Sequence, residues 1–394
     1  MNGLFKEASY LLNRIEENGF RAYFVGGCVR DHWLDKPIKD IDIASSAKPE
    51  EIQRIFPKTI PVGIEHGTVI VRHNHISYEV TTFRKEDKYE DFRRPSKVWF
   101  VSDLEEDLAR RDFTFNAMAM DKSYNLFDPF DGRGDLAKKQ IRTVGHPDER
   151  FYEDPLRLMR ACRFMSTYNL TIEEKTKKAV QKNAPLLKRI SVERITDEFR
   201  KLLEGEWAGP ALSFMKYAGI FMYLPSPVEE KTKGDMLEFN WNFLQEIEQK
   251  WAAFLILGDV KDHREFLKKW KLPNTVINRV LKILNAYNVD YWTKMDVYRF
   301  GLETAVLGIQ LKYANQLISY ENHIQRVKDL ALEIPIASRN EIPLNGVDIL
   351  RIKQETPGVW LGQLYDEMEK EIVEGNLSLS KDLLTDWVRK WEQK

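Results

Sequence analysis

The sequence predicts an α+β fold, with a small mixed sheet near its start and helices throughout the remainder. Runs of apolar or alternating residues, which are typical of short strands, occur up to Thr82. From about Arg150 onward, apolar residues recur mainly at helical spacing, and strand patterns become scarce. The chain has 394 residues, 43% of them hydrophobic, so it is long enough for two or three domains with a sizeable core.

The first part of the chain mixes helix and strand patterns. An opening helix is predicted to end at Asn18-Gly19, because apolar residues recur at helical spacing between Leu4 and Ile15. A second helix is predicted over residues 29–34. Four segments have the apolar runs or the period-two alternation of strands, the last two forming a hairpin: residues 22–25, 39–44, 67–71 and 77–82.

Prolines interrupt the helical pattern of the remainder. Breaks are predicted at Leu224–Pro227 and at Leu272–Asn274. A third irregular stretch, Ile334–Asn345, carries two prolines and separates a final helical segment from the rest.

Charge and cysteine content restrict the partners and the compartment. Sixty basic residues balance sixty-one acidic ones, so a polyanionic partner must be bound by local patches rather than by a global field. Cys28 and Cys162 are too few for a disulfide framework, which predicts a reducing, cytoplasmic compartment. Because the sequence contains no run of about 18 apolar residues, we expect no membrane-spanning segment.

Two aspartates are the candidate metal ligands. Asp40 and Asp42 stand two apart in a predicted strand, so their side chains point to the same face of the sheet. Paired carboxylates of this kind are typical ligands of Mg²⁺, whose remaining ligands are often substrate phosphates. The alternative is a solvated strand edge.

A glycine pair precedes these aspartates. Gly26 and Gly27 lie between a predicted strand and a predicted helix, where backbone amides without side-chain bulk can approach a phosphate. Arg30 adds a fork of donors for phosphate oxygens. The sequence contains neither GxxxxGK[ST] nor GxGxxG, so the main motifs that would indicate a P-loop ATPase or a dinucleotide oxidoreductase are missing.

These motifs resemble those of a known family. GGCVRD followed by DID is similar to the signature of nucleotidyltransferases related to DNA polymerase beta, in the branch of tRNA CCA-adding enzymes and bacterial poly(A) polymerases. Further segments resemble that branch in the same order: EHGTVIV at 65–71, YEVTTFR at 78–84, RRDFTFNAMAM at 110–120, EDPLRLMRACRF at 153–164 and SVERITDE at 191–198.

The resemblance implies a domain order. We expect a polymerase-beta-like catalytic head over residues 1–143 and an all-helical remainder. That remainder would comprise a neck for base selection (144–205), a body (206–275) and a tRNA-binding tail (276–394).

The helix predicted to start near Asp154 carries the candidate base-selecting residues. Its apolar residues form one stripe, and three arginines recur at three-residue steps on the opposite arc: Arg157, Arg160 and Arg163. A carboxylate accepts and a guanidinium donates, so an Asp/Arg pair complements the edges of cytosine and adenine but not those of uracil and guanine. The resemblance implies that Asp154 and Arg157 act as this template and that the other two arginines contact the nucleotide. The alternative is a capped helix with solvated arginines.

The resemblance also assigns roles to residues of the head. Arg111 matches an arginine that holds the triphosphate, and Asp112 lies in a motif credited with sensing the ribose. Glu79 is either a third carboxylate or a surface glutamate. Residues 131–136, DGRGDL, resemble a flexible element that helps the change from CTP to ATP.

The expected activity is addition of C, C and A to a tRNA that lacks a complete 3′ CCA end, from CTP and ATP, with Mg²⁺ as cofactor. Enzymes that add only CC or only A, and poly(A) polymerases, share most of these motifs and remain alternatives.

The C-terminal segments 342–350 and 356–362 resemble class II CCA-adding enzymes, and the end of the chain lacks the strongly basic arm typical of poly(A) polymerases. A catalytically dead RNA-binding protein would have lost DID or GGCVRD, and both are intact. Protein partners cannot be inferred from the sequence.

Overall fold

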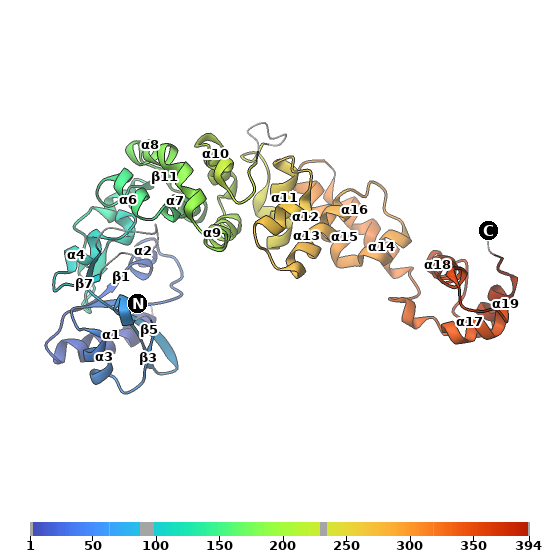
Figure 1. Cartoon of the computed structure of the whole chain (residues 1–394), viewed down its shortest axis with the longest axis horizontal. Helices are drawn as coiled ribbons and strands as arrows, with labels where there is room; N and C mark the ends of the chain where they lie inside the picture. The colour runs from blue at the N-terminus through green and yellow to red at the C-terminus, as the bar shows by residue number, and fades with distance from the viewer. Residues whose placement is uncertain (1–2, 63, 87–97, 229–234, 318, 393–394) are drawn as a thin grey trace. The chain divides into compact units, whose positions relative to one another are not determined.

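The computed structural model describes residues 3–62, 64–86, 98–228, 235–317 and 319–392 (Figure 1). The chain divides into two compact units. The first unit comprises residues 1–237 with 269–271, and the second comprises residues 238–268 with 272–394. In the described part of the chain, no helix is both long enough and apolar enough to cross a membrane.

A seven-stranded mixed sheet is the centre of the first unit. The strand order is β3-β4-β5-β2-β1-β8-β9, in which β2 and β5 are parallel and the other neighbours are antiparallel. The bounds are Ala22–Val25 for β1, Asp42–Ser45 for β2, Thr59–Pro61 for β3, Thr68–His73 for β4, Ile76–Thr82 for β5, Ala119–Met120 for β8 and Leu126–Phe127 for β9. The predicted α+β class with a small mixed sheet is therefore confirmed.

The hairpin of β4 and β5 turns more tightly than predicted. Asn74 and His75 form its two-residue loop, and both have positive φ, 46° and 65°. Two successive residues in this region are the signature of a type I′ turn, whose twist matches that of the flanking strands.

Short helices cover the sheet. Helices α1 (Gly3–Glu17) and α3 (Pro49–Ile55) pack together and against the strands, α3 on β4 and β5 (Figure 1). On the Asp42 side, α4 (Leu104–Ala109) closes a small apolar core that includes Val25 and Ala44. The remaining helical elements of the head are α2 (Gly27–Trp33), α5 (Gly132–Ala137), η1 (Ile64–His66) and η2 (Thr114–Asn116).

The sequence did not predict β3 or the six short strands from β6 to β11. β8 and β9 extend the main sheet, and β6 (Arg84–Glu86) pairs with β7 (Val98–Phe100). β10 (Gln140–Ile141) and β11 (Thr171–Ile172) form a parallel pair that ties the end of the head to the helices that follow. Two- and three-residue strands are too short to show a period-two pattern.

In its described part, the first unit continues with the α-helices α6 (Pro147–Glu153), α7 (Leu156–Tyr168), α8 (Glu174–Asn183), α9 (Val192–Glu204) and α10 (Ala208–Tyr217), and with the 3-10 helices η3 (Ala184–Arg189) and η4 (Ile220–Tyr223). α7 packs against both α9 and α10. The predicted apolar stripe of α7 faces this packing, because Leu158, Ala161 and Cys162 are fully buried.

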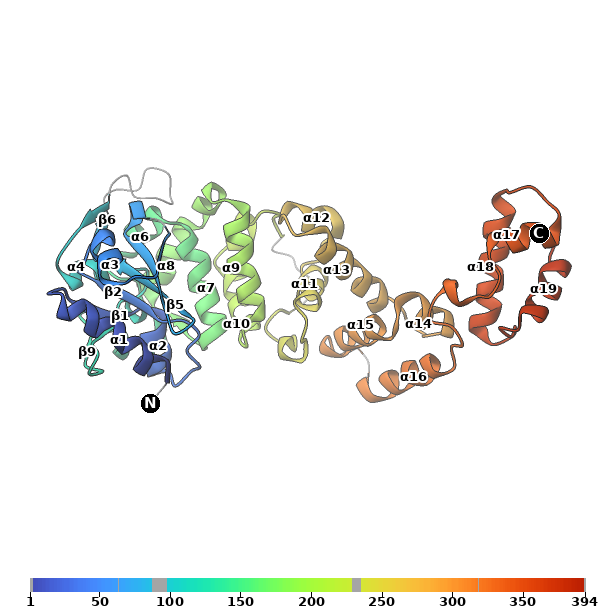
Figure 2. The same cartoon turned by 90° about the horizontal axis from the view of Figure 1, so that it is seen from below.

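The described part of the second unit is helical, as predicted (Figure 2). Its helices are α11 (Ile247–Leu257), α12 (His263–Lys269, which runs into the segment assigned to the first unit), α13 (Asn274–Tyr287), α14 (Lys294–Phe300), α15 (Leu302–Ala314), α16 (Tyr320–Leu332), α17 (Gly346–Lys353), α18 (Val359–Glu374) and α19 (Lys381–Lys390). The last three share a core that contains Leu364 and Leu384. The irregular stretch predicted at Ile334–Asn345 separates α16 from α17.

Candidate active site

A cavity of about 510 Å³ opens in the first unit and collects most of the predicted site residues. Its lining comes from β2, α2, the segment after α4, α7 and α9. The predicted residues that line it are Gly27, Arg30, Asp42, Arg111, Asp154, Arg157, Arg160 and Arg163. Asp40 does not line it.

Asp42 is the first residue of β2, and Asp40 precedes the strand. The predicted strand over residues 39–44 therefore begins too early. The register pairs Asp42 with Val25, the last residue of β1, so the chain before Asp42 has no partner on that side. Asp40 is exposed, yet its charge still acts on Asp42.

Glu79 lies directly opposite Asp42 in the parallel ladder of β2 and β5. Burial raises the pKa of the Asp42 carboxyl above its usual range, and the charges of Glu79 and Asp40 raise it further, although Arg111 opposes them. Three carboxylates thus concentrate negative charge at one end of β2.

This donor set fits a hard divalent cation. In the described part of the chain, no group of three or more His, Cys, Asp or Glu side chains is arranged to hold a metal by itself. Mg²⁺ commonly binds through one or two carboxylates and takes its other ligands from water and substrate phosphates. Asp40 and Asp42 therefore suit a site that is completed by a bound nucleotide.

The glycine pair leaves the backbone open beside Asp42. Gly26 has φ 72°, and a Cβ there would lie 2.9 Å from Nη1 of Arg111 and 3.8 Å from Oδ2 of Asp42. α2 begins at Gly27, two residues earlier than predicted. A side chain at position 26 would occupy the space between the carboxylate and the guanidinium.

Arg30 is firmly positioned at the cavity wall. Its Nη1 donates to Oδ1 of Asn116 over 2.7 Å, and its Nε and Nη2 donate to Asp31 over 2.9 and 3.0 Å. The guanidinium also stacks 4.6 Å from the ring centroid of Tyr168. These contacts fix one orientation of the side chain.

Arg111 is anchored by a buried carboxylate. Asp107 is fully buried and lies 3.3 Å from Nη2 of Arg111 and 2.9 Å from Nη2 of Arg110. Although burial alone would raise the pKa of Asp107, the two guanidiniums hold it below its usual range. Among the described residues, the buried Nε of Arg111 has no hydrogen-bond partner. A donor without a partner at a cavity wall favours an anionic ligand.

Asp112 links the head to α7. Its Oδ2 accepts hydrogen bonds from Arg160, 2.7 Å from Nε, and its Oδ1 accepts from Nδ2 of Asn116 over 2.9 Å. Asp112 is only 7% exposed. Burial would raise its pKa, but Arg160, Asn116 and Arg157 together hold that pKa far below the usual range.

Asp154 ends α6 and directly precedes the start of α7. Its Oδ1 accepts a hydrogen bond from the backbone N–H of Leu156 over 3.1 Å, although the N-cap position of α7 is Pro155. Its Oδ2 accepts a hydrogen bond over 2.9 Å from Nη2 of Arg194, a residue of α9.

Arg157 is 7% exposed, so it is not a solvated arginine. Its Nη1 donates to Oε2 of Glu153 over 2.9 Å and to the carbonyl of Arg150 over 3.2 Å. Its Nη2 donates to the carbonyl of Arg110 over 3.1 Å. These contacts hold the guanidinium at the wall of the cavity beside Asp154.

Arg160 and Arg163 share the carboxylate of Glu198, a residue of α9. Oε2 of Glu198 lies 3.1 Å from Nε of Arg163 without the geometry of a hydrogen bond, and Oε1 lies 3.8 Å from Nη1 of Arg160. Glu198 is buried, so these ion pairs are only weakly screened by solvent.

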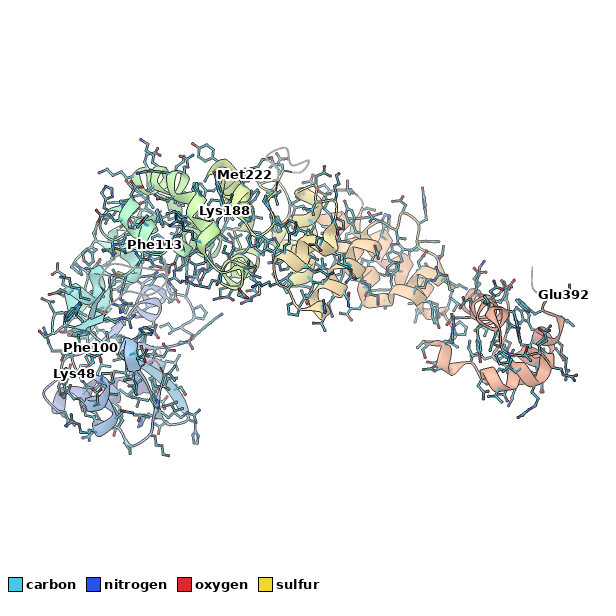
Figure 3. All side chains as sticks on the ribbon, viewed as in Figure 1. Lys48, Phe100, Phe113, Lys188, Met222 and Glu392 are labelled. Atoms are coloured by element: carbon cyan, nitrogen blue, oxygen red, sulfur yellow. The ribbon has the colours of Figure 1, made fainter. Side chains whose placement is uncertain are left out.

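Aromatic rings support this wall. Phe113, which is labelled in Figure 3, packs 5.7 Å from Phe164 and 5.6 Å from Phe115 between ring centroids. The guanidinium carbons of Arg30 and Arg163 lie 5.3 and 4.3 Å from the centroid of the Phe164 ring. The Phe164 ring therefore positions cations from two elements.

Sequence reasoning missed Arg194, Glu198 and Phe164 as site residues. Arg194 and Glu198 stand four apart on α9, beside a buried stripe that contains Ile195 and Phe199. Charged side chains at that spacing next to an apolar stripe were the available signal.

Three protein-family models match parts of the chain. Residues 22–142 match the Poly A polymerase head domain, residues 169–229 match the probable RNA and SrmB-binding site of polymerase A, and residues 243–388 match the putative tRNA nucleotidyltransferase domain 2.

Individual relatives match over nearly the whole chain. The chain is 41% identical over 389 residues to the CCA-adding enzyme of Geobacillus sp. (strain WCH70), which covers 98% of this chain and 96% of that protein. It is 43% identical over 397 residues to the CCA-adding enzyme of Enterococcus faecalis (strain ATCC 700802 / V583), with 99% and 97% covered. The crystal structure of the Bacillus stearothermophilus CCA-adding enzyme in complex with CTP superposes with a TM-score of 0.91 at 38% identity, over 98% of this chain and 97% of that one.

The head fold and the family matches define a nucleotidyltransferase with a polymerase-beta-like head. The head alone does not distinguish poly(A) synthesis from CCA synthesis, but the full-length relatives do. The chain belongs to the class II CCA-adding enzymes.

Proposed function

We propose which of the chain's own residues carry out the activity of its family, the addition of C, C and A to the 3′ end of tRNA from CTP and ATP. The head, residues 1–143, would supply the catalytic carboxylates Asp40 and Asp42, and the neck, residues 144–205, would select the base. The body, residues 206–275, and the tail, residues 276–394, would bind tRNA. The observation that carries the proposal is that one cavity is lined by both Asp42 and the Asp154–Arg157 pair.

Asp40 and Asp42 would hold the divalent metal used by enzymes with this head. We propose Mg²⁺, because the donors are carboxylates and the substrates bring phosphates. When bound, Mg²⁺ activates the RNA 3′-hydroxyl and neutralises charge on the triphosphate.

Arg111 and the open backbone at Gly27 would orient the triphosphate. The free Nε of Arg111 and the cationic lining of the cavity support this role. Arg30, Arg160 and Arg163 would add positive charge around the nucleotide. Preorganised donors of this kind stabilise the charge that develops on the departing pyrophosphate.

Asp154 and Arg157 would read the base. Each carboxylate oxygen can accept more than one hydrogen bond, so Asp154 can still accept from an exocyclic amine while it is held by Arg194. Arg157 uses its two terminal nitrogens in protein contacts and keeps further N–H groups for an acceptor on the base. An amine donor beside an acceptor occurs on cytosine and adenine, whereas uracil and guanine present the reverse order.

A tRNA that lacks part of its 3′ CCA end would be the RNA substrate. The relative from Thermotoga maritima was solved as a CCA-adding enzyme complexed with tRNA, and it shares this fold with a TM-score of 0.65. The cytoplasm would be the compartment, because Cys28 and Cys162 are free thiols.

The test offers purified chain a tRNA without its 3′ end, with CTP, ATP or both, and sizes the product to one nucleotide. We expect three additions with both nucleotides and then a stop, and no incorporation by Asp42→Ala. Arg157→Ala should accept UTP or GTP more readily. A long homopolymer, near-normal turnover by Asp42→Ala, or unchanged base choice by Arg157→Ala would each contradict the corresponding assignment.

A further inference from the structure

A second cavity lies on the head and shares no lining residue with the catalytic one. Its volume is about 620 Å³, which is within the range typical of small-molecule sites. It is bounded by α1, by the segment that leads into β3 and by the turn end of the β4–β5 hairpin. The residues that define its chemistry are Tyr10, Phe56, Lys58, Arg72, His73 and His75.

The charged lining of this cavity is cationic. Lys58 directly precedes β3 and Arg72 lies on the neighbouring strand β4, where its backbone N–H donates to the carbonyl of Lys58 over 2.9 Å. Both side chains are exposed, and within the described residues neither has an ion-pair or hydrogen-bond partner. Among the residues that the structure describes, no aspartate or glutamate lines the cavity. Two neighbouring cations without a counter-charge favour an anionic ligand.

The same cavity presents an aromatic stack. The rings of Tyr10 and His73 lie parallel, with centroids 4.3 Å apart and an interplanar angle of 12°. Tyr10 is 45% exposed, so this stack is open to a ligand. Aromatic faces beside cations are the elements with which proteins bind nucleotide units, because every base has a stacking face.

We propose that this cavity is a second nucleotide site, in which the base stacks on the Tyr10–His73 pair and the phosphate is bound by Lys58 and Arg72. The ligand is a phosphorylated nucleoside, either free or as one unit of a single strand of RNA. The site lies on the same sheet as Asp42, because Ser77 of its lining is two residues, about 7 Å, from Glu79 along β5, and Glu79 pairs with Asp42. The assignment does not depend on the roles proposed for the catalytic cavity.

The experiment labels the full chain with 8-azidoadenosine 5′-monophosphate under ultraviolet light and maps the modified peptides by mass spectrometry. We expect label on the peptide with Tyr10 or on that with His73, in addition to any label in the catalytic cavity. In the double variant Lys58→Glu/Arg72→Glu, the yield of this label should be lower than in the wild type by a factor of about ten or more. Tyr10→Ala should weaken it about tenfold through lost stacking.

Lys48→Glu is the matched control, since Lys48 is an exposed lysine of the same head that lines neither cavity (Figure 3). It should label like the wild type. Circular dichroism and unchanged labelling of the catalytic cavity verify that the variants are folded. Absence of label near Tyr10 and His73, or equal labelling in the double variant, would overturn the proposal.

Competition separates the two sources of the ligand. CMP at millimolar concentration and a short single-stranded oligonucleotide are each added before irradiation. Stronger protection by CMP identifies a free nucleotide, and stronger protection by the oligonucleotide identifies a strand. Failure of both to protect would overturn the site, whatever the outcome of the tRNA assay.

Discussion

Arg194 of α9 donates a hydrogen bond over 2.9 Å to the carboxylate of Asp154, the residue at the junction of α6 and α7. The contact fixes the one carboxylate for which we propose a base-reading role. It also makes the geometry of that carboxylate depend on how α9 packs against α7.

Arg194→Ala should therefore impair base selection without removing any group that reads the base. A hydrogen bond to a charged group contributes about 1.5–3 kcal/mol, so we expect kcat/KM for CTP and ATP to fall about 10- to 100-fold. Discrimination against UTP and GTP should narrow as well. Single-nucleotide incorporation with each of the four nucleotides measures both effects.

Arg200→Ala is the control on the same helix. Arg200 pairs with Asp197 and Glu204 on the surface of α9, where such pairs contribute little. If both variants behave like the wild type, Arg194 does not position Asp154.

The contact between Arg194 and Asp154 is a feature of the site that could not be predicted from the sequence. Gly27, Asp42 and Arg157 could be found from local patterns. Gly27 belongs to a glycine pair after a predicted strand, Asp42 to a pair of aspartates two apart, and Arg157 to the start of a predicted helix. Arg194 is forty residues from Asp154, and Glu198 is as remote from the arginines of α7. Their spacing on α9 indicates a charged face, but the partners of that face are set by helix packing, which the local sequence pattern does not specify.

Asp40 shows a different limit. Its alternation with Ile41 continues the strand pattern, but a strand needs a paired neighbour, and β1 ends at the residue opposite Asp42. Alternation predicts which side chains share a face, whereas the ends of strands depend on partners elsewhere in the chain.

Glu79 is the next residue to test, because the register sets it opposite Asp42. Glu79→Gln keeps the shape and removes the charge, so it should raise the Mg²⁺ concentration for half-maximal rate about tenfold, as is typical when a group beside a metal ligand is changed. Asp42→Asn should not be rescued at any Mg²⁺ concentration. Metal titration of tRNA extension gives these values.

Glu105→Gln removes an exposed carboxylate on α4 and serves as the control. An identical Mg²⁺ dependence in Glu79→Gln and Glu105→Gln would make Glu79 a surface glutamate.

The ion pairing of Asp112 predicts that the stability of the folded chain depends on pH. Its pKa is lowered in the folded state by Arg160, Asn116 and Arg157, against the effect of burial. A carboxyl with a depressed folded-state pKa contributes stability that is complete above its unfolded pKa, about 3.9, and is lost as the pH falls toward the folded-state value. Asp112→Asn should therefore be less stable than the wild type at neutral pH, and the difference should shrink below about pH 4.

Native-state hydrogen exchange of the α7 amides at about pH 7, 5 and 3.5 measures this difference. Asp148→Asn is the control, because Asp148 pairs with Lys182 near the surface and contributes little. A constant difference between wild type and Asp112→Asn across that range would show that Asp112 does not titrate as inferred.

Gly308 controls the packing of α15 against α13 in the second unit. A Cβ at this position would lie 2.7 Å from the Cβ of Ala286, and 2.8 and 2.9 Å from backbone atoms of Ala286 and Tyr287. Backbone atoms cannot rotate away, so Gly308→Ala should cost about 1–3 kcal/mol from overpacking, against a helix-propensity gain of at most about 1 kcal/mol. Gly362→Ala on α18 is the matched control, since nothing lies within 4 Å of its added Cβ and only the gain in helix propensity applies.

Chemical unfolding followed by circular dichroism should show lower stability for Gly308→Ala and higher stability for Gly362→Ala. Ala286→Gly in the Gly308→Ala background removes one of the three close contacts, so the double-mutant cycle should show a favourable coupling but only partial rescue. Equal stability of Gly308→Ala and Gly362→Ala would mean that the two helices can separate without cost.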